Sequence, residues 1–255
     1  MSEKLSDQKV AVITGGAAGI GRAIGAALHR DRYAVAVLGR NRERLEETRK
    51  DGFRPYVCDV GDENQVAETV AKIHSDFGRV DVLVNNAGII HVGMLEDMPV
   101  GSIDDQLQIN IAGVIYMTKA CAPLLRETAG SIINISSGLA SKPVMAHAVY
   151  SATKGAIEAF SRAMALELHD SGVRVNVIAP SLVRSDIYVT DGMDPKDYDN
   201  LHVELGKQYL MGRSGEPEDV AELAAFLVSD KASWMTGTVY PVDSGFRSVG
   251  NKPGH

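Results

Sequence analysis

Short apolar runs rich in β-branched residues alternate along the chain with longer segments in which apolar residues recur at helical spacing. Several of the short runs are apolar at consecutive positions, which is typical of strands covered by helices on both faces of a sheet. The predicted strands are 9–14, 33–39, 54–59, 80–86, 130–136, 173–179 and 238–242. The predicted helices are Ile20–His29, Arg42–Lys50, Glu63–Phe77, Ile103–Arg126, Val149–His169 and Glu216–Val228.

This regular alternation predicts a parallel sheet with right-handed crossover connections. Because composition does not shift along the series, we expect one doubly wound Rossmann-type α/β domain over residues 1–255, with a seven-stranded parallel sheet and helices on both faces. Residues 181–215 read instead as irregular, and they follow a strand whose carboxyl end should face the ligand crevice. We therefore expect this segment to form a lid over the crevice. The ends, residues 1–8 and 248–255, are expected to be flexible tails.

The overall charge and the cysteines exclude several classes of protein. A formal net charge of −7 disfavours nucleic-acid binding, which needs a basic face. Cys58 and Cys121 lie in apolar stretches without C-x-x-C or paired-histidine spacing, so we expect buried, reduced thiols and no metal site. The chain has no signal-peptide pattern and no run of about twenty apolar residues, so we expect no membrane partner and a cytoplasmic location.

A glycine-rich stretch, TGGAAGIG at residues 14–21, joins the first predicted strand to the first helix. In this setting Gly15 permits the tight turn, Gly19 lets the backbone approach a pyrophosphate, and Gly21 lets the helix pack closely on the strand. The helix N-terminus then directs free N–H groups at the phosphates. The stretch predicts a dinucleotide site, and the alternative is a glycine-rich connection without a ligand.

Further motifs follow this stretch in a fixed order. They are NNAG at 85–88, Asn110 within LQIN, Ser137 within NISSG, YSATK at 150–154 and NVIAP at 176–180. Together with the glycine spacing they resemble the short-chain dehydrogenase/reductase family, in particular its 3-oxoacyl-ACP reductase-like and carbonyl reductase-like members. The resemblance extends from Lys9 to about Val242 and implies hydride transfer between a nicotinamide and a carbonyl or secondary alcohol.

Tyr150 and Lys154 are four residues apart in a helical segment and therefore share one face. An unperturbed tyrosine has a pKa of about 10, too high for efficient acid–base catalysis at neutral pH, and a nearby ammonium lowers it. Such a pair is often only an exposed helix face. The resemblance implies that Tyr150 is the general acid or base, and that Lys154 tunes it and binds the nicotinamide ribose.

Two more polar residues gain a role from the resemblance. Ser136 ends a predicted strand and Ser137 follows it. The family's serine, thirteen positions before the tyrosine, corresponds to Ser137, whose hydroxyl would donate to the substrate oxygen. Asn110 fits poorly in an apolar helical pattern, and a solvated or capping role is one account of it. The resemblance implies another, in which Asn110 interrupts the helix and holds a water that links Lys154 to solvent.

The end of the second predicted strand bears on the choice of nucleotide. NAD enzymes place an acidic residue there for the adenosine ribose, whereas this chain has Gly39 followed by Arg40. A guanidinium suits a 2′-phosphate, so we predict NADP, with NAD as the alternative. The other residues expected to bind the dinucleotide are Ile20, Asp59, Val60, Asn86, Ala87, Gly88, Val183 and Ser185.

The sequence leaves the substrate open. Ser137, Leu139, His147 and Tyr188 are expected to contact it, and a neutral ketone, a sugar or polyol, or a 3-oxoacyl thioester would fit. One alternative function is a catalytically silent NADP-binding sensor or scaffold. Another is an NAD-dependent sugar, polyol or hydroxyacid dehydrogenase. The resemblance also implies a homodimer or homotetramer.

Overall fold

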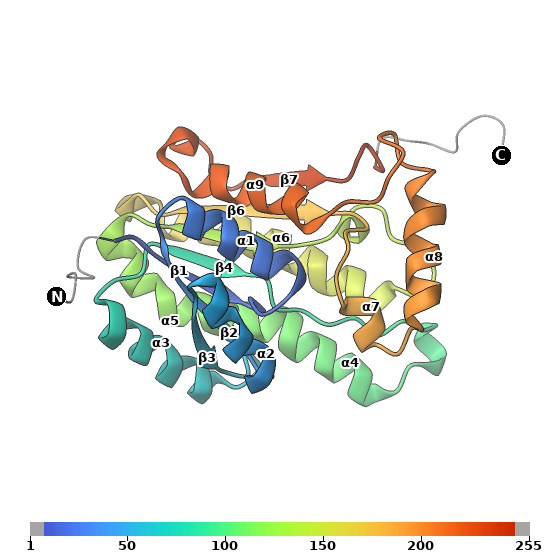
Figure 1. Cartoon of the computed structure of the whole chain (residues 1–255), viewed down its shortest axis with the longest axis horizontal. Helices are drawn as coiled ribbons and strands as arrows, with labels where there is room; N and C mark the ends of the chain where they lie inside the picture. Colours follow the sequence, from blue (N-terminus) through green and yellow to red (C-terminus); the bar gives the residue numbers. More distant parts are fainter. Residues whose placement is uncertain (1–7, 248–255) are drawn as a thin grey trace.

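A computed structural model describes residues 8–247, which form a single sheet between two layers of helices (Figure 1). The sheet has seven strands, all parallel, in the order β3-β2-β1-β4-β5-β6-β7. The strands are β1 Val10–Thr14, β2 Ala34–Gly39, β3 Arg54–Val57, β4 Val82–Asn85, β5 Ser131–Ile135, β6 Arg174–Pro180 and β7 Val239–Val242. The predicted fold class and strand count are confirmed.

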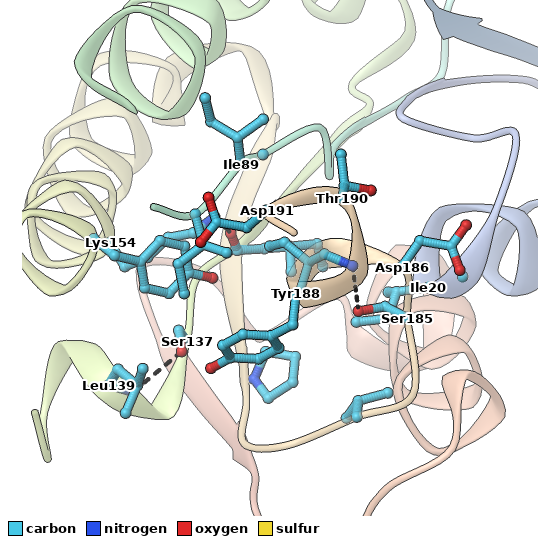
Figure 2. Close-up of a pocket in the computed structure, with 18 of the residues that line it drawn as sticks. Ile20, Ile89, Ser137, Leu139, Lys154, Ser185, Asp186, Tyr188, Thr190 and Asp191 are labelled. Atoms are coloured by element: carbon cyan, nitrogen blue, oxygen red, sulfur yellow. Dashed lines mark hydrogen bonds between the residues drawn. The ribbon is translucent and has the colours of Figure 1, made fainter. Parts of the chain in front are cut away.

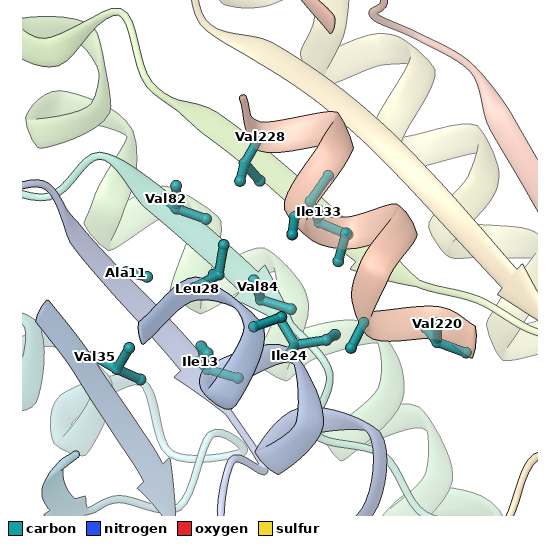
Figure 3. Packing of buried hydrophobic residues seen from close by; sticks show 14 of the residues in the cluster. Ala11, Ile13, Ile24, Leu28, Val35, Val82, Val84, Ile133, Val220 and Val228 are labelled. Carbon is teal, nitrogen blue, oxygen red and sulfur yellow. The ribbon is translucent and has the colours of Figure 1, made fainter. Parts of the chain in front are cut away.

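The sheet separates the hydrophobic core into two clusters, and helices cover each of them. The α-helices are α1 Gly19–Arg30, α2 Arg42–Glu47, α3 Glu63–Phe77, α4 Val100–Leu107, α5 Gly113–Thr128, α6 Ala148–Glu167, α7 Ile187–Thr190, α8 Pro195–Gly206 and α9 Pro217–Val228. On one face, Ile24 and Leu28 of α1 and Val220 and Val228 of α9 pack over β1, β4 and β5 (Figure 3). On the other face lie α3, α5 and α6.

The strands that carry the site are buried because helices cover both sides of them. Every residue of β1, β4 and β5 is buried, which explains why these segments are apolar without alternation. Their carboxyl ends open at the same edge of the sheet, where the crevice of a doubly wound fold lies.

The helix predicted over 103–126 is not continuous. It consists of α4, a π-helical segment over Gln108–Ala112 and α5. Asn110 lies in the middle of the π-helical segment and is fully buried. The interruption agrees with the poor fit of Asn110 in the apolar pattern, and a π-helical turn of this kind often marks a functional site.

The expectation of an irregular segment over 181–215 is wrong, because that segment contains α7 and α8 (Figure 1). Asp194 caps α8 by accepting a hydrogen bond from Lys196 N, and Pro195 occupies the first helical turn. Residues 194–200, the polar run DPKDYDN, therefore form the start of a helix in which Tyr198 and His202 are buried.

The remaining expectations concern the ends and the thiols. The tails 1–7 and 248–255 lie outside the described residues, and Gln8 donates to Arg32 O. Cys58 and Cys121 are free and buried, and burial raises the pKa of Cys121 to about 12. Between residues 8 and 247, no helix has the length and apolar character needed to cross a membrane, and no cluster of side chains suits a metal ion.

Candidate active site

A cavity of about 1470 Å³ lies at the carboxyl ends of the strands. The glycine turn, the ends of β2, β4, β5 and β6, the start of α6 and the segment with α7 and α8 all line it. Figure 2 shows Ser137, Lys154, Tyr188 and Asp191, which come from distant parts of the sequence, directed toward one space. The predicted lid segment thus forms a wall of the cavity.

The glycine turn has the features of a phosphate-binding loop. Gly15 and Gly19 line the cavity, and Gly19 has a φ of +50°, a conformation that favours glycine. The first residue of α1 follows Ala18, which has no side chain able to cap the helix, so the N–H groups there remain available to an anion. Gly21 does not line the cavity. A Cβ there would lie 2.5 Å from Gly15 O, so its role is close packing behind the turn.

Thr14, which the sequence analysis missed, fastens this turn to the end of β4. Its hydroxyl oxygen accepts hydrogen bonds from the backbone N–H groups of Asn86 and Ala87, each at 3.0 Å. The Asn86 side chain donates in return to Thr14 O at 3.0 Å and to Gly15 O at 3.2 Å. Asn86, Ala87 and Gly88 line the cavity, so the network holds two of its walls together.

Arg40 lies on the cavity wall just after β2, and 63% of its side chain is exposed. Its Nη1 is 3.9 Å from Asp59 Oδ2, a loose contact that leaves the guanidinium accessible. Asp59, Ile20, Val183 and Ser185 also line the cavity. Val60 does not line it, because its side chain turns inward and packs against Gly113.

Tyr150 and Lys154 lie on the face of α6 that borders the cavity, and both are buried. Lys154 Nζ is 5.6 Å from the centre of the Tyr150 ring and donates to Ile135 O at 3.0 Å. Burial lowers the pKa of Lys154 to about 8. Burial also raises the pKa of Tyr150, and a hydrogen bond with Ser137 only partly opposes the rise. In the free protein burial is thus the dominant influence on the pKa of Tyr150, and a lowering of this pKa by the Lys154 ammonium stays a prediction.

Ser136 and Ser137 both line the cavity, but their hydroxyl groups differ. Ser136 Oγ donates within the protein, to Glu158 Oε1 at 3.0 Å or Lys154 O at 3.3 Å. Ser137 Oγ accepts from Leu139 N at 3.2 Å (Figure 2), and its own proton is directed to the cavity side, where Tyr150 also lies. Leu139 itself lines the cavity. The geometry favours Ser137 as the donor to a substrate oxygen.

Asn110 lies behind the cavity wall rather than on it. Its side chain accepts from Ile89 N at 2.9 Å and donates to Ile89 O at 2.9 Å and to Thr153 Oγ1 at 3.1 Å. Both amide protons are thus used within the protein, so a relay water could meet this side chain only at the remaining lone pair of Oδ1. A Cβ at Gly88 would lie 3.3 Å from both Asn110 Oδ1 and Lys154 Nζ, so these atoms lie on the same side of that loop.

Two side-chain contacts, one at each end of α7, connect the lid segment to α2 and to the loop after β4. Asp186, before α7, pairs with Arg44 of α2 at 2.8 Å. Asp191, after α7, pairs with His91 Nδ1 at 2.6 Å and accepts from Val92 N at 3.0 Å. These contacts join residues about 100 or more positions apart, and neither pair could be predicted from a local pattern.

The buried amine of Lys154 makes stability depend on pH. The unfolded chain holds the lysine proton up to about pH 10.5, whereas the folded chain releases it near pH 8, so a rise in pH through this window favours the folded state. We expect the free energy of unfolding of wild type, relative to a Lys154→Met variant, to increase by about 2 kcal/mol between pH 7.5 and 9.5. Urea titrations at several pH values measure this difference, and a constant difference would contradict it.

Comparisons with known proteins show the family to which the chain belongs. A family model described as enoyl-(acyl carrier protein) reductase matches residues 15–247. The chain belongs to the short-chain dehydrogenase/reductase family of oxidoreductases. It is 38% identical to an uncharacterised oxidoreductase of Methylorubrum extorquens, over 94% of this chain and 98% of the relative. It is 35% identical to the human 3-oxoacyl-[acyl-carrier-protein] reductase, over 94% of this chain and 99% of the relative.

Solved structures of oxidoreductases have the same fold over nearly the whole chain. The aldohexose dehydrogenase of Thermoplasma acidophilum superposes with a TM-score of 0.88 at 30% identity and covers 98% of both chains. A 3-ketoacyl-(acyl-carrier-protein) reductase from Brucella melitensis, solved in complex with NADH, superposes with a TM-score of 0.84 at 31% identity, over 96% of this chain and all of the other.

Proposed function

We propose that this protein is an NADP(H)-dependent oxidoreductase that interconverts a carbonyl compound and a secondary alcohol, with Tyr150 as the general acid or base. The observation that carries the proposal is that Ser137, Tyr150 and Lys154 line the same cavity as the uncapped N-terminus of α1. The cavity would therefore combine an anion site for a pyrophosphate with the hydroxyl donor of Ser137, the phenol of Tyr150 and the amine of Lys154. Relatives named as reductases support the same reaction class.

The residues that would hold the dinucleotide follow the cavity wall. Gly15, Gly19 and Ile20 would face the pyrophosphate, Arg40 and Asp59 the adenosine half, and Val183 and Ser185 the nicotinamide half. When bound, the nicotinamide supplies or accepts the hydride.

The protein groups then manage the charge and the proton at the substrate oxygen. The Ser137 hydroxyl donates a hydrogen bond to that oxygen and so polarises the carbonyl. Tyr150 delivers a proton to the oxygen in reduction and removes one in oxidation. Because burial disfavours the phenolate, Tyr150 holds its proton in the free protein and is suited to act first as an acid. Lys154, held by Ile135 O, supplies the adjacent positive charge when it is protonated.

A panel of neutral ketones, sugars and 3-oxoacyl thioesters tests the activity, with oxidation of NADPH followed at 340 nm as the readout. Turnover of at least one class supports the enzyme, whereas tight NADPH binding without turnover across the panel favours the sensor or scaffold alternative.

We also propose a homodimer or homotetramer, since Leu166 of α6 and Trp234 beside β7 are 75% and 98% exposed. Light scattering measures the assembly.

The preference for NADP depends on Arg40. An Arg40→Asp variant removes the guanidinium and places a carboxylate where the adenosine ribose hydroxyls would lie, so the ratio of kcat/KM with NADPH to that with NADH should fall by about a hundredfold. Arg42, which opens α2 and does not line the cavity, provides the control Arg42→Asp. A wild-type preference for NADH, or an unchanged ratio in Arg40→Asp, would overturn the assignment of NADP.

A further inference from the structure

One polar pair on the cavity wall has no part in the proton chemistry. His147 immediately precedes α6, and Tyr188 lies on α7 of the lid segment, where Figure 2 shows it beside Ser137. His147 Nδ1 is 2.8 Å from Met145 O, and since a carbonyl oxygen only accepts, Nδ1 carries the proton. In the neutral imidazole, Nε2 is then a hydrogen-bond acceptor.

The partner of this acceptor is the Tyr188 hydroxyl, and the contact is long. The two atoms are 3.5 Å apart, at the outer limit of a hydrogen bond, and the rings meet edge to face with centroids 6.2 Å apart. Burial raises the pKa of Tyr188 to about 12, so the phenol remains a neutral donor. A small hydroxyl group placed at this pair could donate to His147 Nε2 and accept from Tyr188 Oη.

Several other polar side chains that line the cavity have partners within the protein. Asp191 pairs with His91, and Ser181 Oγ is 2.8 Å from Tyr209 Oη. Lys142 Nζ donates to Phe246 O at 2.8 Å and lies 4.4 Å above the Phe246 ring. The exposed Lys207 pairs with Glu204. Apart from Lys154, both lysines that line the cavity, Lys142 and Lys207, therefore have partners within the protein.

Much of the remaining wall is apolar, although the polar residues Thr190 and Gln208 also line the cavity. The apolar side chains include Leu139, Val144, Leu182, Met193, Leu201, Leu205 and Phe246. A sugar would leave several hydroxyl groups against these side chains without partners, at a cost for each one. A mainly apolar molecule with a single hydroxyl leaves none, provided that this hydroxyl meets the polar pair.

We propose that His147 and Tyr188 form a subsite for one substrate hydroxyl close to the reacting carbonyl, so that the preferred substrates are apolar hydroxyketones and the corresponding diols. The closeness follows from the chain itself, because His147 is three residues before Tyr150 and Tyr188 faces the space beside Ser137 (Figure 2). The inference rests on the proposed ketone reduction, and it names the substrate class that the sequence left open.

Two ketones of equal chain length test the subsite, 3-hydroxy-2-octanone and 2-octanone, with NADPH as reductant. Wild type should show a kcat/KM at least about tenfold higher for the hydroxyketone. His147→Phe keeps an aromatic ring beside Tyr188 but removes the acceptor, so this ratio should fall to near one. Tyr188→Phe removes only the hydroxyl and should lower the ratio in part, which provides a second, conservative variant.

The matched control is His169→Phe, at the other end of α6. His169 also has Nδ1 against a backbone carbonyl, that of Leu166 at 2.7 Å, but it is exposed and does not line the cavity. This variant should retain the wild-type ratio. Equal activity of wild type on both ketones, or a ratio that survives in both His147→Phe and Tyr188→Phe, overturns the subsite while the reductase proposal stands. If wild type binds NADPH and reduces neither ketone, the reductase proposal loses this support and the subsite falls with it.

Discussion

A Tyr150→Phe variant is expected to lose about three orders of magnitude in kcat while it binds NADPH as tightly as wild type. The substitution removes one oxygen atom and keeps the ring, so the buried packing on α6 is preserved. The chemical step then has no group that can give its proton to the substrate oxygen, because the Ser137 hydroxyl only polarises it. Steady-state kinetics measure the loss, and NADPH fluorescence titration measures the binding.

Tyr116→Phe is a suitable control for this loss. Tyr116 lies on α5, packs against the core on the sheet face covered by α3, α5 and α6, and does not line the cavity. The kcat of the Tyr116→Phe variant should therefore stay within twofold of wild type. A Tyr150→Phe variant that keeps more than a tenth of wild-type turnover would refute the assigned role. Equal losses of turnover and NADPH affinity would instead indicate that Tyr150 acts mainly in binding.

The fold could be predicted from the sequence because the signal is local and repeated. Each buried strand is an apolar run bounded by turns, and α3 begins and ends within the predicted range Glu63–Phe77. Asp62 caps the N-terminus of that helix, and Gly78 ends the helix in the left-handed region. A single residue therefore marks each boundary in the sequence. The start of α8 carried a similar signal in Asp194 and Pro195, but the polar residues around it resemble a loop.

The candidate site was predictable where a motif fixes a position in the fold. Gly15, Ser137, Tyr150 and Lys154 reach one cavity because each follows or borders a strand end. Contacts that depend on tertiary structure were not predictable, and the clearest case is the pair Asp186–Arg44. The pKa of Tyr150 belongs to the same class, since its direction depends on how completely the fold buries the ring.

Asn110 shows how the structure adds to a prediction about mechanism. The family resemblance implies a water relay through this residue, which stays a prediction, and the structure adds that its side chain makes two hydrogen bonds to the backbone of Ile89 and one to Thr153. Ile89 lines the cavity, and Thr153 Oγ1 donates to Tyr150 O at 2.8 Å. We therefore propose that Asn110 acts as a positioning residue, because its hydrogen bonds connect the loop after β4 to the helix of Tyr150.

An Asn110→Leu variant should therefore lose both stability and turnover. The N–H and C=O of Ile89 lose their partners, which costs about 2 kcal/mol in the free energy of unfolding. The loop that carries Gly88 and Ile89 then shifts relative to Lys154, and kcat should fall by about a hundredfold, since a displacement of about 1 Å at reacting groups has that effect.

Urea denaturation and kinetics well below the unfolding transition separate these two losses. The same substitution at the exposed Asn64 of α3, Asn64→Leu, should change stability by less than about 0.5 kcal/mol and leave kcat unaffected. If Asn110 were only structural, Asn110→Leu would unfold more easily but its folded fraction would turn over at the wild-type rate. A fall in kcat that persists in fully folded protein, with little change in NADPH affinity, is the result that a positioning role requires.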